Sequence, residues 1–211
     1  MPRPKKTESE ITAMREKILE SAESILQQKG SQGLSIRAIA EHIGVSHMVL
    51  YSYFDSREEL VSALRERHRK RNQQRHQEVL QKAKTGDVRT VMSEVLQDNI
   101  SFAHKNPRVF RFLWGPRDKM SNHDCEHQDK KHHPKGIIKE VQLLSEIIQL
   151  GIEKHEFIER DPEVAAYLIL GTINTPLIMD QFLNAIDKKT LEKLEKEALK
   201  TCMNYLTGQE M

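Results

Sequence analysis

The segment from His123 to His133 concentrates side chains that could ligate a metal ion. It holds four histidines, a cysteine and carboxylates, which are the groups that bind Zn²⁺ or Ni²⁺. The spacing matches neither a zinc finger nor a pair of histidines on one helix face, and a solvated polar loop has the same composition. A metal-responsive protein is therefore an alternative hypothesis, with the candidate ligands His123, Cys125, His127 and His132.

The sequence shows no pattern typical of a catalytic site. Glycine-rich phosphate loops, GxSxG, HExxH and paired carboxylates on one face are not found in a suitable context. Cys125 and Cys202 lie far apart and form no CxxC, which excludes a disulfide framework and a four-cysteine zinc site. We predict no enzyme and no cofactor; an all-α enzyme or a pure interaction module is the weaker alternative.

Charge is distributed unevenly along the 211 residues. Residues 1–85 carry net +5 and residues 86–211 carry net −3, within a total of +2. The first part of the chain is therefore expected to meet an acidic polymer or surface. The N-terminus has no apolar segment typical of export, and the apolar-rich stretch 164–186 is interrupted by polar residues and a proline. We predict a cytoplasmic protein without a membrane span.

The strongest local pattern lies between Ser35 and Phe54. Ser35 and Ser46 can each cap a short helix, and Gly44 lies in the turn between the two helices. Ala40, four residues before Gly44, permits close contact of the helices, and the neighbouring apolar positions face inward: Ile39, Ile43, Val45, Leu50 and Tyr53. This spacing is typical of a helix-turn-helix, whose second helix enters a DNA groove.

The same block resembles the DNA-binding domain of TetR-family transcriptional regulators over about residues 11 to 64. The motifs that carry the likeness are Leu34-Ser-Ile-Arg37, Ile43-Gly-Val-Ser46, Leu50-Tyr-Ser-Tyr-Phe54 and Ser56-Arg-Glu-Glu-Leu60. The resemblance implies a homodimeric, ligand-responsive repressor on a pseudo-palindromic site in double-stranded DNA.

The resemblance also implies roles for individual residues. Its groove-facing positions correspond to Arg37, His47, Met48, Val49 and Tyr51. Its phosphate contacts correspond to Ser35, Ser46, Tyr51, Tyr53 and Arg57. At the position of Arg57 the family usually has lysine. Lys5 and Lys6 form a basic arm that could enter the minor groove. Because Tyr53 falls at an inward position, Tyr51 is the better phosphate ligand.

Apolar periodicity predicts an all-α protein of about nine helices. A stripe from Ile11 to Ile25 marks the first helix, which stops at the Gly30–Gly33 turn, and Ser56 with Glu59 forms a capping box for a long helix over 56–84. Residues 1–55 are the predicted DNA-binding domain, and 56–211 are the predicted effector-binding and dimerisation domain. The later helices are expected at 88–103, 106–114, 137–152, 161–186 and 187–206, with a third short helix ending at Tyr53.

Two surfaces are expected in the second domain. The helix over 161–186 is apolar on nearly all sides, so it and the helix over 187–206 are predicted to form the dimer interface. A small apolar or amphipathic effector is predicted to bind between the fifth, sixth and seventh helices, although the same residues also describe a plain core: Met92, Leu96, Asn99, Phe110, Leu113, Trp114, Leu144 and Ile148. The basic run from Arg65 to Arg71 is interpreted as a solvated face.

Overall fold

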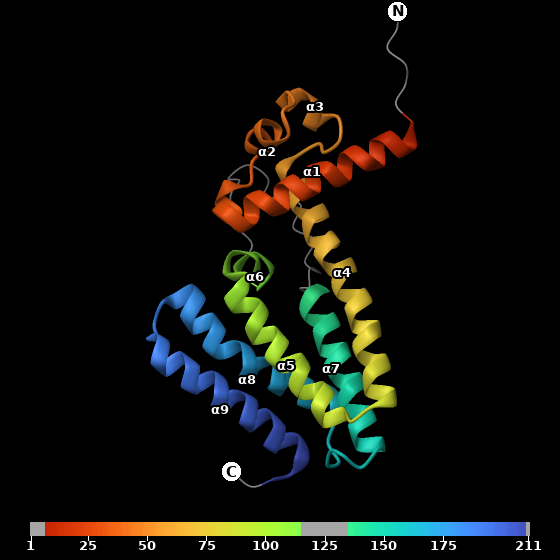
Figure 1. Cartoon of the computed structure of the whole chain (residues 1–211), viewed down its shortest axis with the longest axis vertical. Coiled ribbons are helices and arrows are strands. Elements are labelled where there is room, and N and C mark those ends of the chain that lie inside the picture. The colour runs from red at the N-terminus through yellow and green to blue at the C-terminus, as the bar shows by residue number, and fades with distance from the viewer. Residues whose placement is uncertain (1–6, 115–134, 210–211) are drawn as a thin grey trace, which may run out of the picture. The chain divides into compact units, whose positions relative to one another are not determined.

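A computed structural model describes residues 7–114 and 135–209, and within these ranges every regular element is helical (Figure 1). This confirms the predicted all-α class and the estimate of about nine helices. A short 3₁₀ turn, Ser31–Gly33, follows the first helix. The α-helices are α1 (Glu8–Lys29), α2 (Ile36–Ile43), α3 (His47–Tyr51), α4 (Arg57–Thr85), α5 (Val88–Lys105), α6 (Pro107–Trp114), α7 (Lys135–Glu153), α8 (Pro162–Leu183) and α9 (Lys188–Thr207).

The described residues divide into two compact units. The first unit comprises the described residues up to Arg71 together with Arg108–Leu113. The second comprises Asn72–Pro107 and the described residues from Trp114 onward. The division falls inside α4, so this one helix contributes its first half to one unit and its second half to the other.

In the first unit, α1 is fixed at both ends by local hydrogen bonds. Thr7 and Glu10 form a capping box, in which Thr7 Oγ1 accepts from the Glu10 N–H at 3.2 Å and Glu10 Oε2 accepts from the Thr7 N–H at 2.8 Å. Gly30 ends the helix at φ +73°, a backbone conformation that favours glycine. The face of α1 between these ends buries an apolar stripe, formed by Ile18, Ala22, Ile25 and Leu26.

In the second unit, α5, α7, α8 and α9 share an apolar core with the end of α4. Met92, Ile147, Ile148 and Leu206 are completely buried there. Burial of such side chains contributes roughly 1.5–3 kcal/mol each to folding. This unit is therefore held together mainly by the packing of aliphatic side chains.

Helix α8 begins as its sequence predicts. Asp161 caps it, accepting from the Glu163 and Val164 N–H groups at 3.0 Å, and Pro162 occupies the first turn, where its missing N–H costs nothing. The helix ends at Leu183, three residues before the predicted end, because Asn184 adopts a left-handed conformation at φ +47°. In the part of the chain described, no helix combines the length and the apolar content needed to cross a bilayer.

Three other predicted helix boundaries differ from the structure. The third helix ends at Tyr51, before the predicted Tyr53, and the Ser52 hydroxyl donates to the Val49 carbonyl at 2.7 Å. Ser56 accepts from the Glu59 N–H as expected, but the Glu59 side chain binds the Asp55 N–H instead of completing the predicted box. The sixth helix begins at Pro107, one residue after the start of the expected range, and Asn106 is the C-cap of α5.

Candidate nucleic-acid interface

The turn between α2 and α3 depends on Gly44. This residue lies at φ +74° and ψ +35°, and its N–H donates to the carbonyls of Ala40 and Glu41. A Cβ added at Gly44 would meet no atom within 4 Å, so the positive φ, and not crowding, is the reason for glycine. The Val45 N–H then donates to the Ala40 carbonyl at 3.0 Å. These bonds fix the direction in which α3 leaves the turn.

Helix α3 has a buried face and an exposed face. Leu50 is fully buried, and Phe54 beyond the helix is also fully buried. On the other face Met48 is 66% exposed and Tyr51 is 47% exposed, with His47 exposed beside them. Most of the Met48 side chain and nearly half of Tyr51 are thus left to solvent within the described unit. The five residues of α3 thus present the predicted groove-facing side chains to solvent, with Val49 half-buried.

The two serine caps differ in how their hydroxyls are used. Ser35 Oγ accepts from the Ala38 N–H at 3.1 Å and caps α2. Ser46 occupies the N-cap position of α3 but makes no capping hydrogen bond. Arg37 is exposed, and its Nε donates to Glu41 Oε1 at 2.9 Å; this bond raises the pKa of the guanidinium, which stays charged. Ser35, Ser46 and Arg37 are therefore all on the surface, as a DNA contact requires.

Two of the predicted phosphate contacts have other roles in the structure. Arg57 turns back to the end of the 3₁₀ turn, where its Nε donates to the Leu34 carbonyl at 2.7 Å and its Nη2 to the Ser31 carbonyl at 3.2 Å. Tyr53 is only 7% exposed and belongs to the core. Arg57 thus links the start of α4 to the entry of α2, and the burial of Tyr53 argues against a phosphate contact.

Arg15 on α1 holds the segment after α3, a role that the sequence analysis did not identify. Its guanidinium donates to the Tyr53 carbonyl, pairs with Glu59 at 3.1 Å and lies over the Phe54 ring, 4.0 Å from the centroid. The hydrogen bond from the Asp55 N–H, more than Arg15, lowers the pKa of Glu59. Arg15 therefore anchors the end of the helix-turn-helix to α1.

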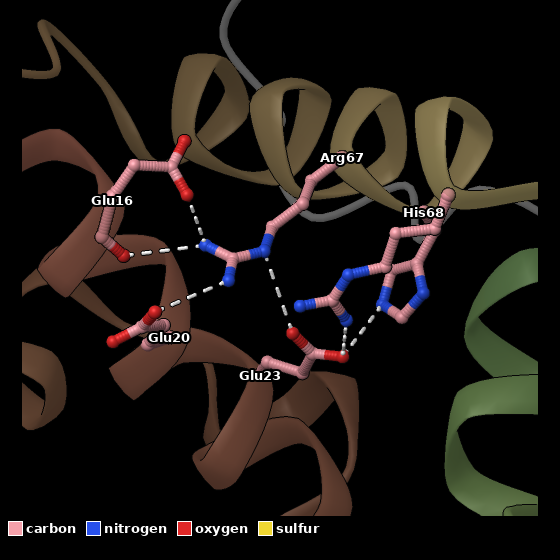
Figure 2. Close-up of polar contacts among 6 residues, drawn as sticks. Glu16, Glu20, Glu23, Arg67 and His68 are labelled. Atoms are coloured by element: carbon pink, nitrogen blue, oxygen red, sulfur yellow. Dashed lines mark hydrogen bonds and ion pairs between the residues drawn. The ribbon is translucent and has the colours of Figure 1, made fainter. Parts of the chain in front are cut away.

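The basic run from Arg65 to Arg71 is not a simple solvated face, so that interpretation was wrong. Figure 2 shows the Arg67 guanidinium among carboxylates of α1. It lies 2.7 Å from Glu16, 3.5 Å from Glu20 and 3.6 Å from Glu23, and the Arg67 side chain is only 13% exposed. Three acidic residues at helical spacing on α1 thus offset the positive charge of Arg67. We call this group of residues on α1 and α4 the Arg67 clasp.

Glu23 is shared between two arginines and one histidine of α4. Besides Arg67, its carboxylate lies 2.6 Å from Arg71 Nη1. It also lies 3.8 Å from His68 Nε2 (Figure 2). His68 is largely enclosed, and its Nε2 has no hydrogen-bond partner within the described residues. Burial lowers the pKa of His68 against the attraction of Glu23, and the nearby Arg71 and Arg67 lower it further. The histidine in this clasp is therefore held in its neutral form.

Several predicted site residues lie outside the described ranges. These are Lys5 and Lys6 of the basic arm and the metal candidates His123, Cys125, His127 and His132. Among the residues that the structure describes, no group of three His, Cys, Asp or Glu side chains could hold a metal ion. Cys202 is buried under α8, and burial raises the pKa of its thiol to about 12, so it is an unreactive core residue.

Most predicted effector contacts lie in packed cores. Met92, Leu96, Leu144 and Ile148 are at most 3% exposed and belong to the core of the second unit. Asn99 donates to the buried Asn174 Oδ1 at 3.1 Å, between α5 and α8. The other three predicted contacts come from α6. Phe110 and Leu113 belong to the first unit, where Phe110 is buried and Leu113 is half-buried. Trp114 belongs to the second unit and is half-buried.

A groove of about 730 Å³ lies elsewhere in the second unit. It runs between the second half of α4, the outer side of α7 and the first turn of α8. None of the eight predicted effector contacts lines it. Its apolar lining includes Leu80, Val141 and Leu150, and charged residues also line it.

Residues 18–64 match the family model for bacterial regulatory proteins of the tetR family. This segment contains α2, the Gly44 turn and α3, with the parts of α1 and α4 on either side in the sequence. No curated protein sequence matches the chain.

Solved structures with the same fold cover most of the chain. The reduced form of NemR from E. coli has a TM-score of 0.70 at 22% identity, over 92% of this chain and 98% of that one. A TetR transcription regulator from Haloarcula marismortui has a TM-score of 0.70 at 18% identity, over 92% and 98%. FadR from Bacillus subtilis, in complex with stearoyl-CoA, has a TM-score of 0.67 at 18% identity, over 90% and 98%.

The matched segment and the shared fold define the class of this protein as an all-α helix-turn-helix DNA-binding regulator. Residues 18–64 are thus similar to the DNA-binding domain of TetR-family transcriptional regulators, and the chain shares the fold of solved members of that family.

Proposed function

We propose that this chain is a repressor that binds a pseudo-palindromic operator as a homodimer and leaves it when a small apolar or amphipathic molecule binds. The observation that carries the DNA-binding part is the exposed face of α3, where His47, Met48 and Tyr51 face solvent on a firmly fixed turn. His47 and Met48 would contact base edges or thymine methyl groups, and the Tyr51 hydroxyl would contact a phosphate. Ser35, Arg37 and Ser46 would add contacts beside them.

The support for a dimer is the exposed apolar stripe of α8. Val164, Tyr167, Leu168 and Leu183 are each more than half exposed, and the small residues Gly171 and Thr175 lie between them on the same face. A contiguous apolar stripe of this kind on a soluble surface marks an interface. Leu194 is the one large hydrophobic residue of α9 that is clearly exposed in the described chain, so α8 would supply most of the contact.

The proposed effector is organic and not metallic. The fold neighbour FadR was solved with stearoyl-CoA, which supports a small-molecule role for the second unit. Operator titrations with Zn²⁺, Ni²⁺ and a panel of hydrophobic compounds distinguish the two alternatives, because metal-only release that His127→Ala abolishes would favour the metal sensor. We place this action in the cytoplasm, where an operator would be, and assign no catalytic reaction to the chain.

Selection of bound sites from a random DNA pool tests the proposal. We expect enrichment of a pseudo-palindrome whose half-sites lie about 34 to 36 Å apart, or slightly more, because two recognition helices of a dimer reach successive major grooves. Leu168→Glu should convert the dimer to a monomer and weaken operator binding. A wild-type protein that enriches no sequence, or that sediments as a monomer at micromolar concentration, would contradict the proposal.

A further inference from the structure

The groove beside α7 has an acidic rim. Glu146 of α7 and Asp161 and Glu163 at the start of α8 line it, whereas Lys84 of α4 is the one cation among its described lining residues. Glu146 and Glu163 are exposed, and neither side-chain carboxylate makes a hydrogen bond or ion pair with another described residue. Asp161 is partly used, because one of its oxygens caps α8. The field at the rim therefore favours a positive charge.

The floor of the groove suits an apolar body. Val141 is 4% exposed, and Leu80 and Leu150 of the same lining are half-buried. Tyr167, which is 51% exposed, adds an aromatic ring at the edge, and aromatic faces attract cations. The volume of about 730 Å³ lies within the range of pockets that hold drug-sized molecules.

One polar group in the wall has no partner. Ser145 Oγ is buried and makes no hydrogen bond in the described structure. A serine on a helix can turn its hydroxyl by rotation about χ1, and here that rotation gives up no existing hydrogen bond. Ser145 can therefore offer a hydrogen bond to a molecule in the groove.

We propose that this groove binds small organic cations with an apolar body, such as quaternary ammonium or phosphonium compounds. Apolar contact with the floor would provide the affinity, and the carboxylates of Glu146 and Glu163 would select the sign of the charge. An anionic amphiphile of the same shape would meet a net negative rim. This inference rests on the proposed function only for its regulatory consequence, which is that these cations are effectors.

The place of the groove suits an effector site. Leu80 and Lys84 lie on the second half of α4, and the same continuous helix begins at Arg57, directly after the helix-turn-helix. A ligand that prefers one position of this end of α4 would shift the balance between conformations of the whole helix.

Two pairs of compounds with matched bodies and opposite charges test the inference, each titrated into the full-length protein without DNA. The pairs are tetraphenylphosphonium with tetraphenylborate, and decyltrimethylammonium with decanoate. We expect at least one cation to bind about tenfold more tightly than its anion, with affinity that falls as salt is added. Anions that bind as tightly as the cations, or no binding of either cation, would overturn the inference.

Substitutions locate the binding site. Glu146→Gln and Glu163→Gln should each weaken cation binding about two- to fivefold, as expected for a partly solvated ion pair, and the double variant about tenfold. Lys84→Gln should strengthen it. Glu94→Gln, at an exposed carboxylate of α5 outside the groove, is the matched control and should have no effect. Cation binding that is unchanged in the double variant would place the ligand elsewhere and overturn the inference.

The competing occupant is a second copy of the chain, because Tyr167 also belongs to the exposed stripe of α8. Cation binding that appears only after Leu168→Glu disrupts a dimer would assign the groove to the interface and overturn the inference. Selection of operator DNA is measured separately. An intact operator preference without cation binding would remove this inference alone, whereas cation binding without any operator preference would remove the proposed function.

Discussion

Both units of this protein have buried apolar cores, but the first also has a helix contact of a different kind. In the first unit, α1 and α4 meet through the Arg67 clasp, where Glu16, Glu20 and Glu23 surround one guanidinium. In the second unit, α5, α7, α8 and α9 meet through buried aliphatic side chains. Ion pairs respond to salt and pH, while apolar packing responds mainly to lost volume. The contact of α1 with α4 should therefore depend more on solution conditions than the core of the second unit does.

The largest expected effect is a cavity in the second core. Ile148 is completely buried, so Ile148→Ala should lower the free energy of unfolding of this unit by about 2–5 kcal/mol. Leu194→Ala, at a side chain that is 39% exposed on α9, should cost much less. Urea unfolding monitored by hydrogen exchange in α7 and α9 measures both. An equal cost for the two variants would show that Ile148 is not in a packed core.

A smaller effect is expected when the clasp is broken. Glu23 is 14% exposed and contacts Arg67, His68 and Arg71, so Glu23→Gln should destabilise the contact of α1 with α4 by about 1–3 kcal/mol. Faster hydrogen exchange in α1 would report this loss, and the difference from wild type should shrink at high salt. Glu78→Gln, at an exposed carboxylate of α4, is the control and should change exchange little. Unchanged exchange in the Glu23 variant would mean that the clasp does not stabilise the unit.

The smallest effect concerns the protonation of His68. Burial lowers the pKa of this histidine from its ordinary value of about 6.5, so the unfolded chain binds its proton more readily than the folded one. The first unit should therefore lose stability as the pH falls below about 6.5, and the loss should level off below the folded pKa. Hydrogen exchange in α1 between about pH 7.5 and about pH 5.5, corrected for intrinsic rates, should show this trend. His68→Gln should remove it; a trend that persists in the variant would assign the titration to another group.

The helix-turn-helix could be predicted from the sequence because its determinants are local. The serine cap at Ser35 and the positive φ at Gly44 are set by residues within a few positions of the turn. The partners of Arg57 and Arg67 could not be predicted in this way, because they are distant in the sequence. Those of Arg57 lie 23 and 26 residues away, and Glu16 lies 51 residues from Arg67. The sequence did contain a signal for the clasp. Both the acidic and the basic residues repeat at helical spacing: Glu16, Glu20 and Glu23 on α1, and Arg67 and Arg71 on α4.

The groove of the second unit was harder to predict for a related reason. An apolar residue such as Met92 or Leu144 has the same periodicity in a packed core and in a cavity wall, and the structure places both in the core. The groove is lined partly by side chains at the edge of the apolar stripe of α7, such as Ser145 and Glu146. Only the packing of α4 and α8 on either side shows that these residues enclose a space.

Whether the exposed face of α3 reads DNA sequence can be measured from the affinities for an operator and for random DNA of equal length. His47→Ala should reduce the difference between the two affinities, because a base contact is lost, by about 1–3 kcal/mol. Tyr51→Phe should weaken both complexes similarly, since a phosphate contact carries no sequence information. Equal losses on both DNAs for His47→Ala, with the preference for the operator intact, would contradict this account.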